Sequence, residues 1–272
     1  LKVLADKDAL FNADGNTNLV ATNRVLGNVK PFLGDYGISR NPESFAKDSY
    51  RSYFTDTSRG AVVRLSQDGL TPISDAGMKD WFGDNLSNYN NSFSTRIIGS
   101  FDDKKQEYNI TLIPDWGKFH VMPPESTTLS YSEPSKGWVS FKSFLHENGI
   151  SINNNYFTFR NSLIYQHHAN AVRNNFYGSQ FDSSVDTLFN QAPSTIKSFS
   201  TLNYEGSQSR ITQDTITNPD YYDNIVKSGW YVQNLISNAQ ELGSMEFWDK
   251  EDKWFSQIKG VTTQWLNDGT AG

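Results

Sequence analysis

Residues 50–70 read YRSYFTDTSRGAVVRLSQDGL and contain the clearest structural pattern of the chain. Residues 50–55 and 61–66 are rich in β-branched and aromatic side chains, which suit strands. Residues 56–60 between them have the polar and glycine composition of a turn. Asp68 and Gly69 then supply the positive φ that a tight hairpin turn requires. The stretch therefore predicts a β-hairpin followed by a second turn.

A second unit with the same character covers residues 96–112. Its residues 102–106 are polar and predict a turn. Tyr108, Ile110 and Leu112 follow at a spacing of two, which places them on one face of a strand.

Further units follow at residues 138–165 and 175–204, the latter with strands expected at residues 185–189 and 196–199. The units recur about every 40 to 50 residues, and each predicts two to four short antiparallel strands. Such spacing is typical of propeller blades. We therefore expect an all-β fold with β-propeller-like repeats, with a β-sandwich as the alternative.

One helical pattern interrupts the strands. Residues 74–86 place Met78, Trp81, Phe82 and Leu86 on one side of a short helix, and Ser74 is a suitable N-cap. We expect a short helical insertion after the first hairpin, with its Met and Trp side chains in the core.

The chain changes character in its last quarter, which predicts a division into residues 1–217 and 218–272. The first is the propeller-like region. The second is a C-terminal hairpin and docking segment, with strands at 230–237 and 244–248 and a charged, aromatic stretch at 250–260. Trp248, Trp254 and Trp265 gather here and predict either core residues or interface anchors.

Composition excludes several classes of function. The 272 residues include no cysteine, so disulfides, thiolate nucleophiles and cysteine-bound zinc are ruled out. The net charge of −6 and the isoelectric point near 5.2 argue against specific nucleic-acid binding, which requires a basic surface. We find no apolar run long enough for a membrane span and no signal peptide.

Histidines are the first candidates for metal or acid–base chemistry, and none of the four stands in a metal-binding motif. His167 and His168 are adjacent, so on a strand their side chains point to opposite faces. His120 and His146 are isolated in sequence. We therefore predict half-buried or polar histidines at strand ends, with no metal and no cofactor.

Carboxylate pairs are the other candidates, because a glycan hydrolase needs two acids that flank the sugar. The pairs are Asp102 with Asp103, Asp182 with Asp186, and Glu246 with Asp249 and Glu251. Their surroundings are those of solvated turns. The sequence also contains no nucleophile elbow and no phosphate-binding loop, so we predict no catalytic residues.

Six stretches together resemble a family of tailed-phage virion proteins, the stabilisation or muzzle-type structural proteins of marine and gut phages. The stretches are residues 53–74, 138–144, 153–159, 163–168, 199–206 and 250–260. The resemblance implies a non-catalytic part of the virion, in the tail, tail tip or neck. By analogy with nozzle proteins it implies β-propellers arranged in an oligomeric ring.

The expected partners are other tail or neck proteins and further copies of the chain. Proteins of this family are longer, and the chain starts at Leu1, so we expect a fragment or a processed product whose propeller is incomplete. The alternatives are an adhesin that binds host-surface glycan through aromatic side chains and an enzyme that hydrolyses cell-wall glycan.

Overall fold

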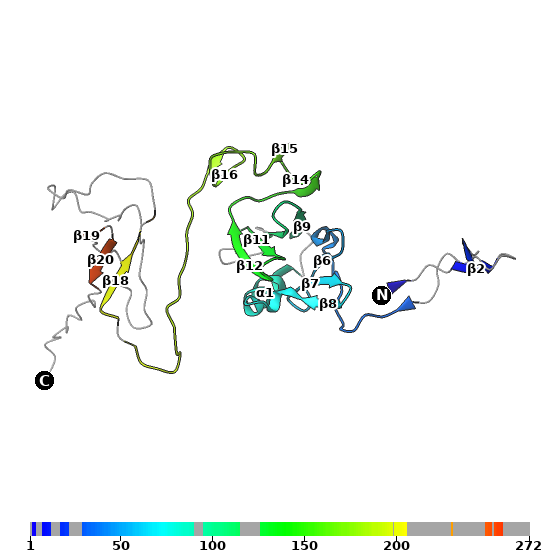
Figure 1. Ribbon diagram of the computed structural model, residues 1–272, viewed down its shortest axis with the longest axis horizontal. Helices are drawn as coiled ribbons and strands as arrows, with labels where there is room; N and C mark the ends of the chain where they lie inside the picture. Colours follow the sequence, from blue (N-terminus) through cyan, green and yellow to red (C-terminus); the bar gives the residue numbers. More distant parts are fainter. Residues whose placement is uncertain are drawn as a thin grey trace, which may run out of the picture. The chain divides into compact units, whose positions relative to one another are not determined.

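The computed structural model describes residues 2–3, 7–11, 17–21, 29–89, 95–114, 126–197, 199–205, 230, 248–251 and 253–257 (Figure 1). These residues form several small antiparallel sheets and one α-helix, and none of the sheets they form is closed. The all-β class is thus confirmed, while the propeller stays a prediction. The chain divides into two units, Leu1–Val185 and Asp186–Gly272. The boundary expected after residue 217 stays a prediction.

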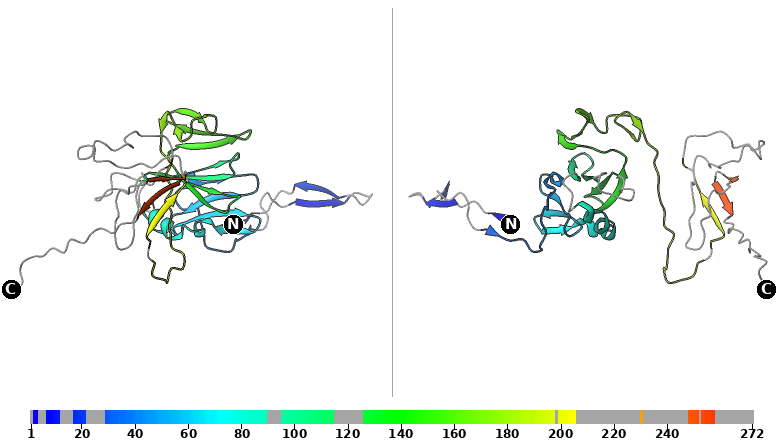
Figure 2. Two further views of the ribbon diagram at one scale, coloured as in Figure 1. Left: turned by 60° about the vertical axis from the view of Figure 1, so that its left-hand side comes forward. Right: turned by 180° about the vertical axis from the view of Figure 1, so that it is seen from behind.

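The first unit begins with two short strand pairs and continues with two four-stranded sheets, seen from two further sides in Figure 2. The pairs are β1 (Lys2–Val3) with β4 (Val29–Lys30) and β2 (Lys7–Phe11) with β3 (Thr17–Ala21). The first sheet has the order β5 (Ala46–Lys47), β6 (Ser52–Asp56), β7 (Ala61–Ser66) and β8 (Gly69–Pro72). The second has the order β12 (Gly137–Lys142), β11 (Thr127–Ser132), β10 (Glu107–Ile113) and β9 (Arg96–Asp102).

Smaller elements complete this unit. A three-stranded sheet has the order β13 (Asn148–Ile152), β14 (Asn155–Arg160) and β15 (Leu163–Gln166), and a hairpin joins β16 (Asn175–Phe176) to β17 (Ser179–Gln180). The helix is α1 (Lys79–Leu86), and single 3₁₀ turns lie at Pro42–Ser44, Ile73–Asp75 and Ser87–Tyr89. Among the residues described, no helix has the length and apolar character needed to span a membrane.

The hairpin predicted from residues 50–70 is present. Asp56 pairs with Ala61 at the end where β6 passes into β7, and Ser66 pairs with Gly69 where β7 passes into β8. Gly69 has a φ of +103°, a conformation that side-chain-bearing residues rarely adopt. The predicted turn chemistry thus sets the register of this sheet.

The two four-stranded sheets share one aromatic core. The ring of Tyr53 stacks on Tyr108 at 4.9 Å and on Phe101 at 5.4 Å between centroids. Tyr53 comes from the first sheet and the other two rings from the second, so the stack joins the sheets. Ile110 and Leu112 are buried in the same core, as the spacing of two predicts.

The helix is present but starts later than predicted. Ser74 lies in a 3₁₀ turn, and α1 begins only at Lys79, after the N-cap residue Met78. Gly77 between them has a φ of +80°, which breaks any helix that starts at Ser74. The prediction for the side chains holds, because Met78 and Trp81 pack against the core.

The unit predicted at residues 138–165 is divided between two sheets. β12 pairs with β11 in the second four-stranded sheet, whereas β13, β14 and β15 form their own sheet. We did not predict β11, whose sequence TTLSYS contains four hydroxyl residues typical of loops. Residues 128–132 are nevertheless buried, because hydrogen bonds satisfy the hydroxyl groups in the interior.

The second unit contains a sheet with the order β18 (Thr201–Tyr204), β20 (Lys253–Gln257) and β19 (Trp248–Lys250). A hairpin joins β19 to β20, with Lys250 opposite Lys253. The C-terminal hairpin and docking segment at residues 218–272 stays a prediction. The strands predicted at 185–189 and 196–199 are wrong, since the described residues there have no strand structure. Apart from Trp230 and Trp248, the strands predicted at 230–237 and 244–248 lie outside the described residues.

Candidate functional site

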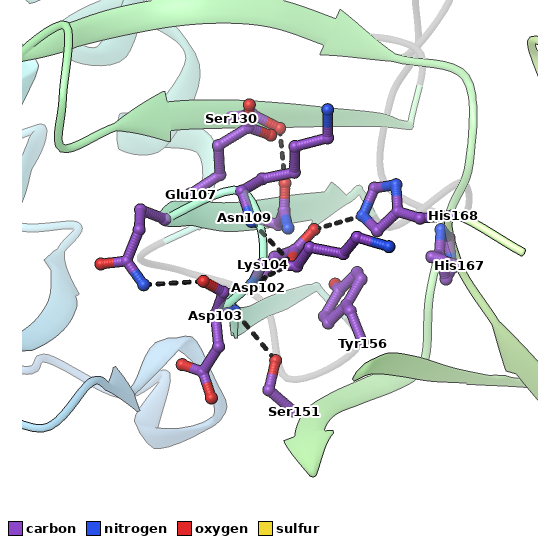
Figure 3. Close-up of polar contacts among 12 residues, drawn as sticks. Asp102, Asp103, Lys104, Glu107, Asn109, Ser130, Ser151, Tyr156, His167 and His168 are labelled. Atoms are coloured by element: carbon purple, nitrogen blue, oxygen red, sulfur yellow. Dashed lines mark hydrogen bonds and ion pairs between the residues drawn. The ribbon is translucent and has the colours of Figure 1, made fainter. Parts of the chain in front are cut away.

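Asp102 is the centre of the most connected polar corner of the first unit (Figure 3). It is the last residue of β9, and its Oδ1 accepts the backbone N–H groups of Lys104 and Lys105 at 3.0 and 3.2 Å. Its Oδ2 lies 2.6 Å from Nε2 of His168. Every one of these contacts comes from a turn, because Lys104 and Lys105 follow β9 and His168 follows β15.

This corner joins two sheets. His168 belongs to the chain that leaves the three-stranded sheet, and its backbone φ of +61° turns the ring toward Asp102. The neighbouring Asp103 donates its backbone N–H to Ser151 Oγ at 3.0 Å, and Ser151 donates to the carbonyl of Phe101 at 2.8 Å. Strands β9 and β13 are therefore bound through side chains, without a shared backbone ladder.

The prediction that Asp102 is a solvated turn acid is wrong. Its exposed fraction is 2%, and both carboxylate oxygens are occupied. Removing a carboxylate from water is costly, and charge-assisted hydrogen bonds offset that cost. Asp103 is half-buried, and burial together with the Asp102 charge raises the pKa of its carboxyl group.

A second polar system lies in the interior, around His146. Thr128 donates to the carbonyl of Phe144 at 2.5 Å, because a carbonyl can only accept. The Thr128 oxygen then accepts from Thr111, at 2.6 Å. The Thr111 oxygen lies 2.7 Å from Nδ1 of His146, and with its own proton already donated it can only accept. The hydrogen of His146 is therefore on Nδ1.

The other side of the ring follows from this assignment. Burial lowers the pKa of His146 to about 3, so the ring is neutral and Nε2 carries no hydrogen. Nε2 therefore accepts from Ser100 Oγ at 2.9 Å, and Ser100 in turn accepts from the Tyr156 hydroxyl at 2.7 Å. All donors point one way along the chain of bonds, from Tyr156 to the Phe144 carbonyl.

The Ser100–His146 pair has the atoms of a nucleophile and a base but is closed to a substrate. The exposed fractions of Ser100 and His146 are 1% and 0%. The serine oxygen and both ring nitrogens already make hydrogen bonds within the interior. Nucleophilic catalysis requires a reacting atom within about 3 Å of the serine oxygen, which this packing does not admit. The pair instead holds β9, β10 and β14 together.

The adjacent histidines take separate partners. Thr158 Oγ1 lies 2.7 Å from Nε2 of His167, whose ring also contacts Phe144 and Phe176. Burial and the nearby His168 lower the pKa of His167 to about 4. Both histidines lie in the turn after β15, outside any strand. His146 is fully buried within a strand-to-strand network, which corrects the expectation of half-buried histidines for that residue.

Glu133 forms a third polar centre, in the turn between β11 and β12. One oxygen accepts from the Tyr53 hydroxyl at 2.7 Å, and the other lies 3.1 Å from Arg64 Nη1 and 3.4 Å from Arg51 Nε. Burial and the bond to Glu133 raise the pKa of Tyr53. Since Tyr53 and Arg64 belong to the first sheet, this carboxylate joins the two four-stranded sheets.

The other predicted candidates do not converge. Asp182, Asp186 and Glu251 are exposed, and the side chains of Glu246 and Asp249 lie outside the described residues, as do His120 and the side chains of Trp248 and Trp265. Trp254 is half-buried in β20. Where residues are described, no group of three His, Cys, Asp or Glu side chains could hold a metal ion.

A comparison with protein families finds a match over part of the chain. Residues 171–260 match the family described as the Crassvirus muzzle protein C-terminal domain. The resemblance to a muzzle-type tail family, and with it the location in the phage virion tail, is confirmed by this match. A comparison with curated proteins finds no match.

Proposed function

We propose that this chain is a non-catalytic subunit of the phage tail muzzle that acts by binding other tail proteins and further copies of itself. The observation that carries the proposal is the match of residues 171–260 to the muzzle family. The polar interior supports it, because Asp102, Ser100 and His146 are all engaged in internal contacts that bind strands to one another. In this proposal these three side chains, which resemble catalytic groups, make the fold rigid and take no part in a reaction.

A muzzle position is preferred over the neck because the matching family is named for the muzzle. A ring of subunits would surround the path of the DNA. With a net charge of −6, such a ring would repel the phosphate backbone and let DNA pass without adhering. The propeller arrangement, the glycan-binding adhesin and the glycan hydrolase stay predictions.

The proposal is tested on purified virions. Mass spectrometry should find the chain in stoichiometric amount with the tail proteins, and a cryo-EM reconstruction should locate it at the distal end of the tail. Particles purified after removal of the tail should lack it. Its absence from intact particles, or a position restricted to the capsid, would contradict the proposal.

The non-catalytic part has its own measurement. The purified chain should release no product from host cell-wall glycan, and an Asp103→Asn variant should behave as the parent does. A turnover that this substitution abolishes would show an enzyme.

A further inference from the structure

One face of the three-stranded sheet β13–β14–β15 carries five large apolar side chains, with Asn148, Asn155 and Gln166 beside them. We call Ile150, Ile152, Phe157, Phe159 and Ile164 the apolar face. The register places Ile150 opposite Phe157 and Phe159 opposite Ile164, so neighbouring strands contribute adjacent side chains. The exposed fractions of Ile150, Ile152 and Ile164 are 49%, 53% and 63%.

The opposite face of the same sheet is the one that packs inward. Tyr156 and Thr158 alternate with Phe157 and Phe159 along β14 and are 1% and 0% exposed. A sheet with one buried face normally carries polar residues on the other, because that face meets water. A contiguous apolar surface of this kind marks an interaction site.

A second exposed apolar surface lies in residues 181–189, which we call the extended segment. It follows β17 and has no strand or helix structure (Figure 1). Its sequence FDSSVDTLF alternates when read as a strand, with Phe181, Ser183, Val185, Thr187 and Phe189 on one side. The other side carries Asp182, Ser184 and Asp186, together with Leu188, which is 87% exposed. The exposed fractions of Val185 and Phe189 are 72% and 59%.

We propose that the extended segment of one copy of the chain lies as a strand across the apolar face of a second copy. Its Phe181, Val185 and Phe189 would cover that face, and its aspartates would point to solvent. The inference rests on the proposed function, because a subunit that meets further copies presents both surfaces to its neighbours. Such a head-to-tail contact, in which two different surfaces meet, can repeat around a closed ring.

We infer that the apolar face binds the extended segment of a second copy, because the extended segment of the same chain starts on the opposite face of the sheet. Just before it, the Tyr177 hydroxyl lies 2.8 Å from Thr158 Oγ1, and the Phe176 ring contacts Phe144 and His167. Thr158 belongs to the inward face. The β16–β17 hairpin is therefore anchored on the side opposite the apolar face, and its chain would have to pass around the sheet to reach that face.

The proposal also accounts for one of the two strands, at residues 185–189 and 196–199, that the sequence predicts and the described residues do not form. Residues 185–189 have the composition of a strand, yet they have no partner ladder among the described residues of the chain. A segment that becomes ordered only on a neighbour would show this combination.

The test uses engineered thiols in the full chain, which has no cysteine of its own. Gln166 lies on the apolar face, opposite Phe157, and Thr187 lies on the apolar side of the segment. Purified Gln166→Cys and Thr187→Cys chains are mixed at about 100 μM and mildly oxidised, and they should form a disulfide-linked pair. This concentration is above the dissociation constants of most specific complexes. A mixture of Thr187→Cys with Ser58→Cys, an exposed turn position, gives the background.

The expected result is at least about tenfold more cross-linked pair in the first mixture than in the second. Adding Ile164→Asp to the Gln166→Cys chain should return the yield of cross-linked pair to background. The circular dichroism spectrum should stay unchanged, because Ile164 is at an exposed position. Equal yields in both mixtures would overturn the inference. So would a Gln166→Cys/Thr187→Cys double variant that closes a disulfide within one chain at high dilution.

A failed cross-link in a chain that mass spectrometry still finds in the tail refutes this contact and leaves the proposed function intact. A second outcome would also refute the inference. If the Gln166→Cys and Thr187→Cys chains form no cross-link and Ile164→Asp still lowers incorporation into virions, the apolar face binds a different tail protein. Absence of the parent chain from virions refutes the proposed function itself.

Discussion

Gly99 should not tolerate even a methyl group. It lies in β9, where a Cβ atom would be 2.0 Å from the carbonyl oxygen of Ser44 and 2.6 Å from its carbonyl carbon. It would also be 3.0 Å from the ring of Tyr108. Both obstacles are fixed, because one is backbone and the other is a fully buried ring. In Gly99→Ala the two segments must therefore separate by about 1 Å to restore an ordinary contact distance.

That displacement also breaks a hydrogen bond. The Tyr108 hydroxyl donates to the same Ser44 carbonyl at 2.7 Å, and both groups are buried. Overpacking costs about 1–3 kcal/mol, and an unsatisfied buried hydroxyl costs about 1–3 kcal/mol more. The lower entropy of an unfolded chain with alanine offsets about 0.4–1 kcal/mol. The free energy of unfolding should fall by about 3 kcal/mol.

Urea denaturation followed by tryptophan fluorescence measures this loss, since Trp81 and Trp138 pack against the affected core. With a slope of about 2–3 kcal/mol per molar urea, the midpoint should fall by about 1 M or more.

Gly137→Ala is the matched control. It is also a strand glycine, but its nearest obstacle is the Ser135 carbonyl oxygen at 3.8 Å. Alanine there should be neutral or stabilise by about 0.5–1 kcal/mol. If Gly99→Ala unfolds at the same urea concentration as Gly137→Ala, the close approach of β9 to Ser44 is refuted.

Two further predictions concern buried polar groups. Stability should fall from pH 7 to pH 5, because burial lowers the pKa of His146 to about 3 and of His167 to about 4, whereas the unfolded histidines titrate near 6.5. The loss approaches about 1.4 kcal/mol per pH unit for each histidine. Urea titrations at both pH values check it, and an unchanged stability would contradict it. Tyr53→Phe removes the hydroxyl that donates to Glu133 and should cost about 1–3 kcal/mol. Tyr50→Phe, at a ring that is 87% exposed, should cost less than about 0.5 kcal/mol, and equal losses would refute the role of that hydroxyl.

Local backbone requirements explain which parts of the fold could be predicted. Asn153 and Asn154 have φ values of +51° and +61°, and two residues with positive φ are what a two-residue hairpin loop needs. Asn tolerates that conformation better than most residues, so the sequence marks the turn before any partner is known. The same reasoning predicted the turn at Asp68 and Gly69, between β7 and β8.

Long-range contacts explain why the sequence did not predict β11. The hydroxyl residues of β11 become a buried strand only because Thr111, Asn109 and the Phe144 carbonyl accept or donate across the interior. No local pattern records those partners. The start of α1 was misplaced for a local reason. Ser74 has the side chain of an N-cap, but the positive φ of Gly77 delays the helix to Lys79.

The candidate site was missed for the same physical reason. Asp102 and His168 are 66 residues apart in sequence, and Ser100 and His146 are 46 apart. A carboxylate next to a polar turn and an isolated histidine look solvated in sequence. Only the fold brings each group next to the hydrogen-bonding partner that offsets the free-energy cost of its burial.

Residues close together in the chain were enough to predict the all-β class, the tight turns, the alternating faces of the strands and the resemblance to phage-tail proteins. These properties depend on residues a few positions apart, through allowed φ values and side-chain alternation. The folded structure was needed to show which strands share a sheet, that Asp102 and His146 are interior groups, and that an apolar sheet face is exposed. Those outcomes depend on which distant segments pack together, because burial is a property of the neighbours a residue acquires.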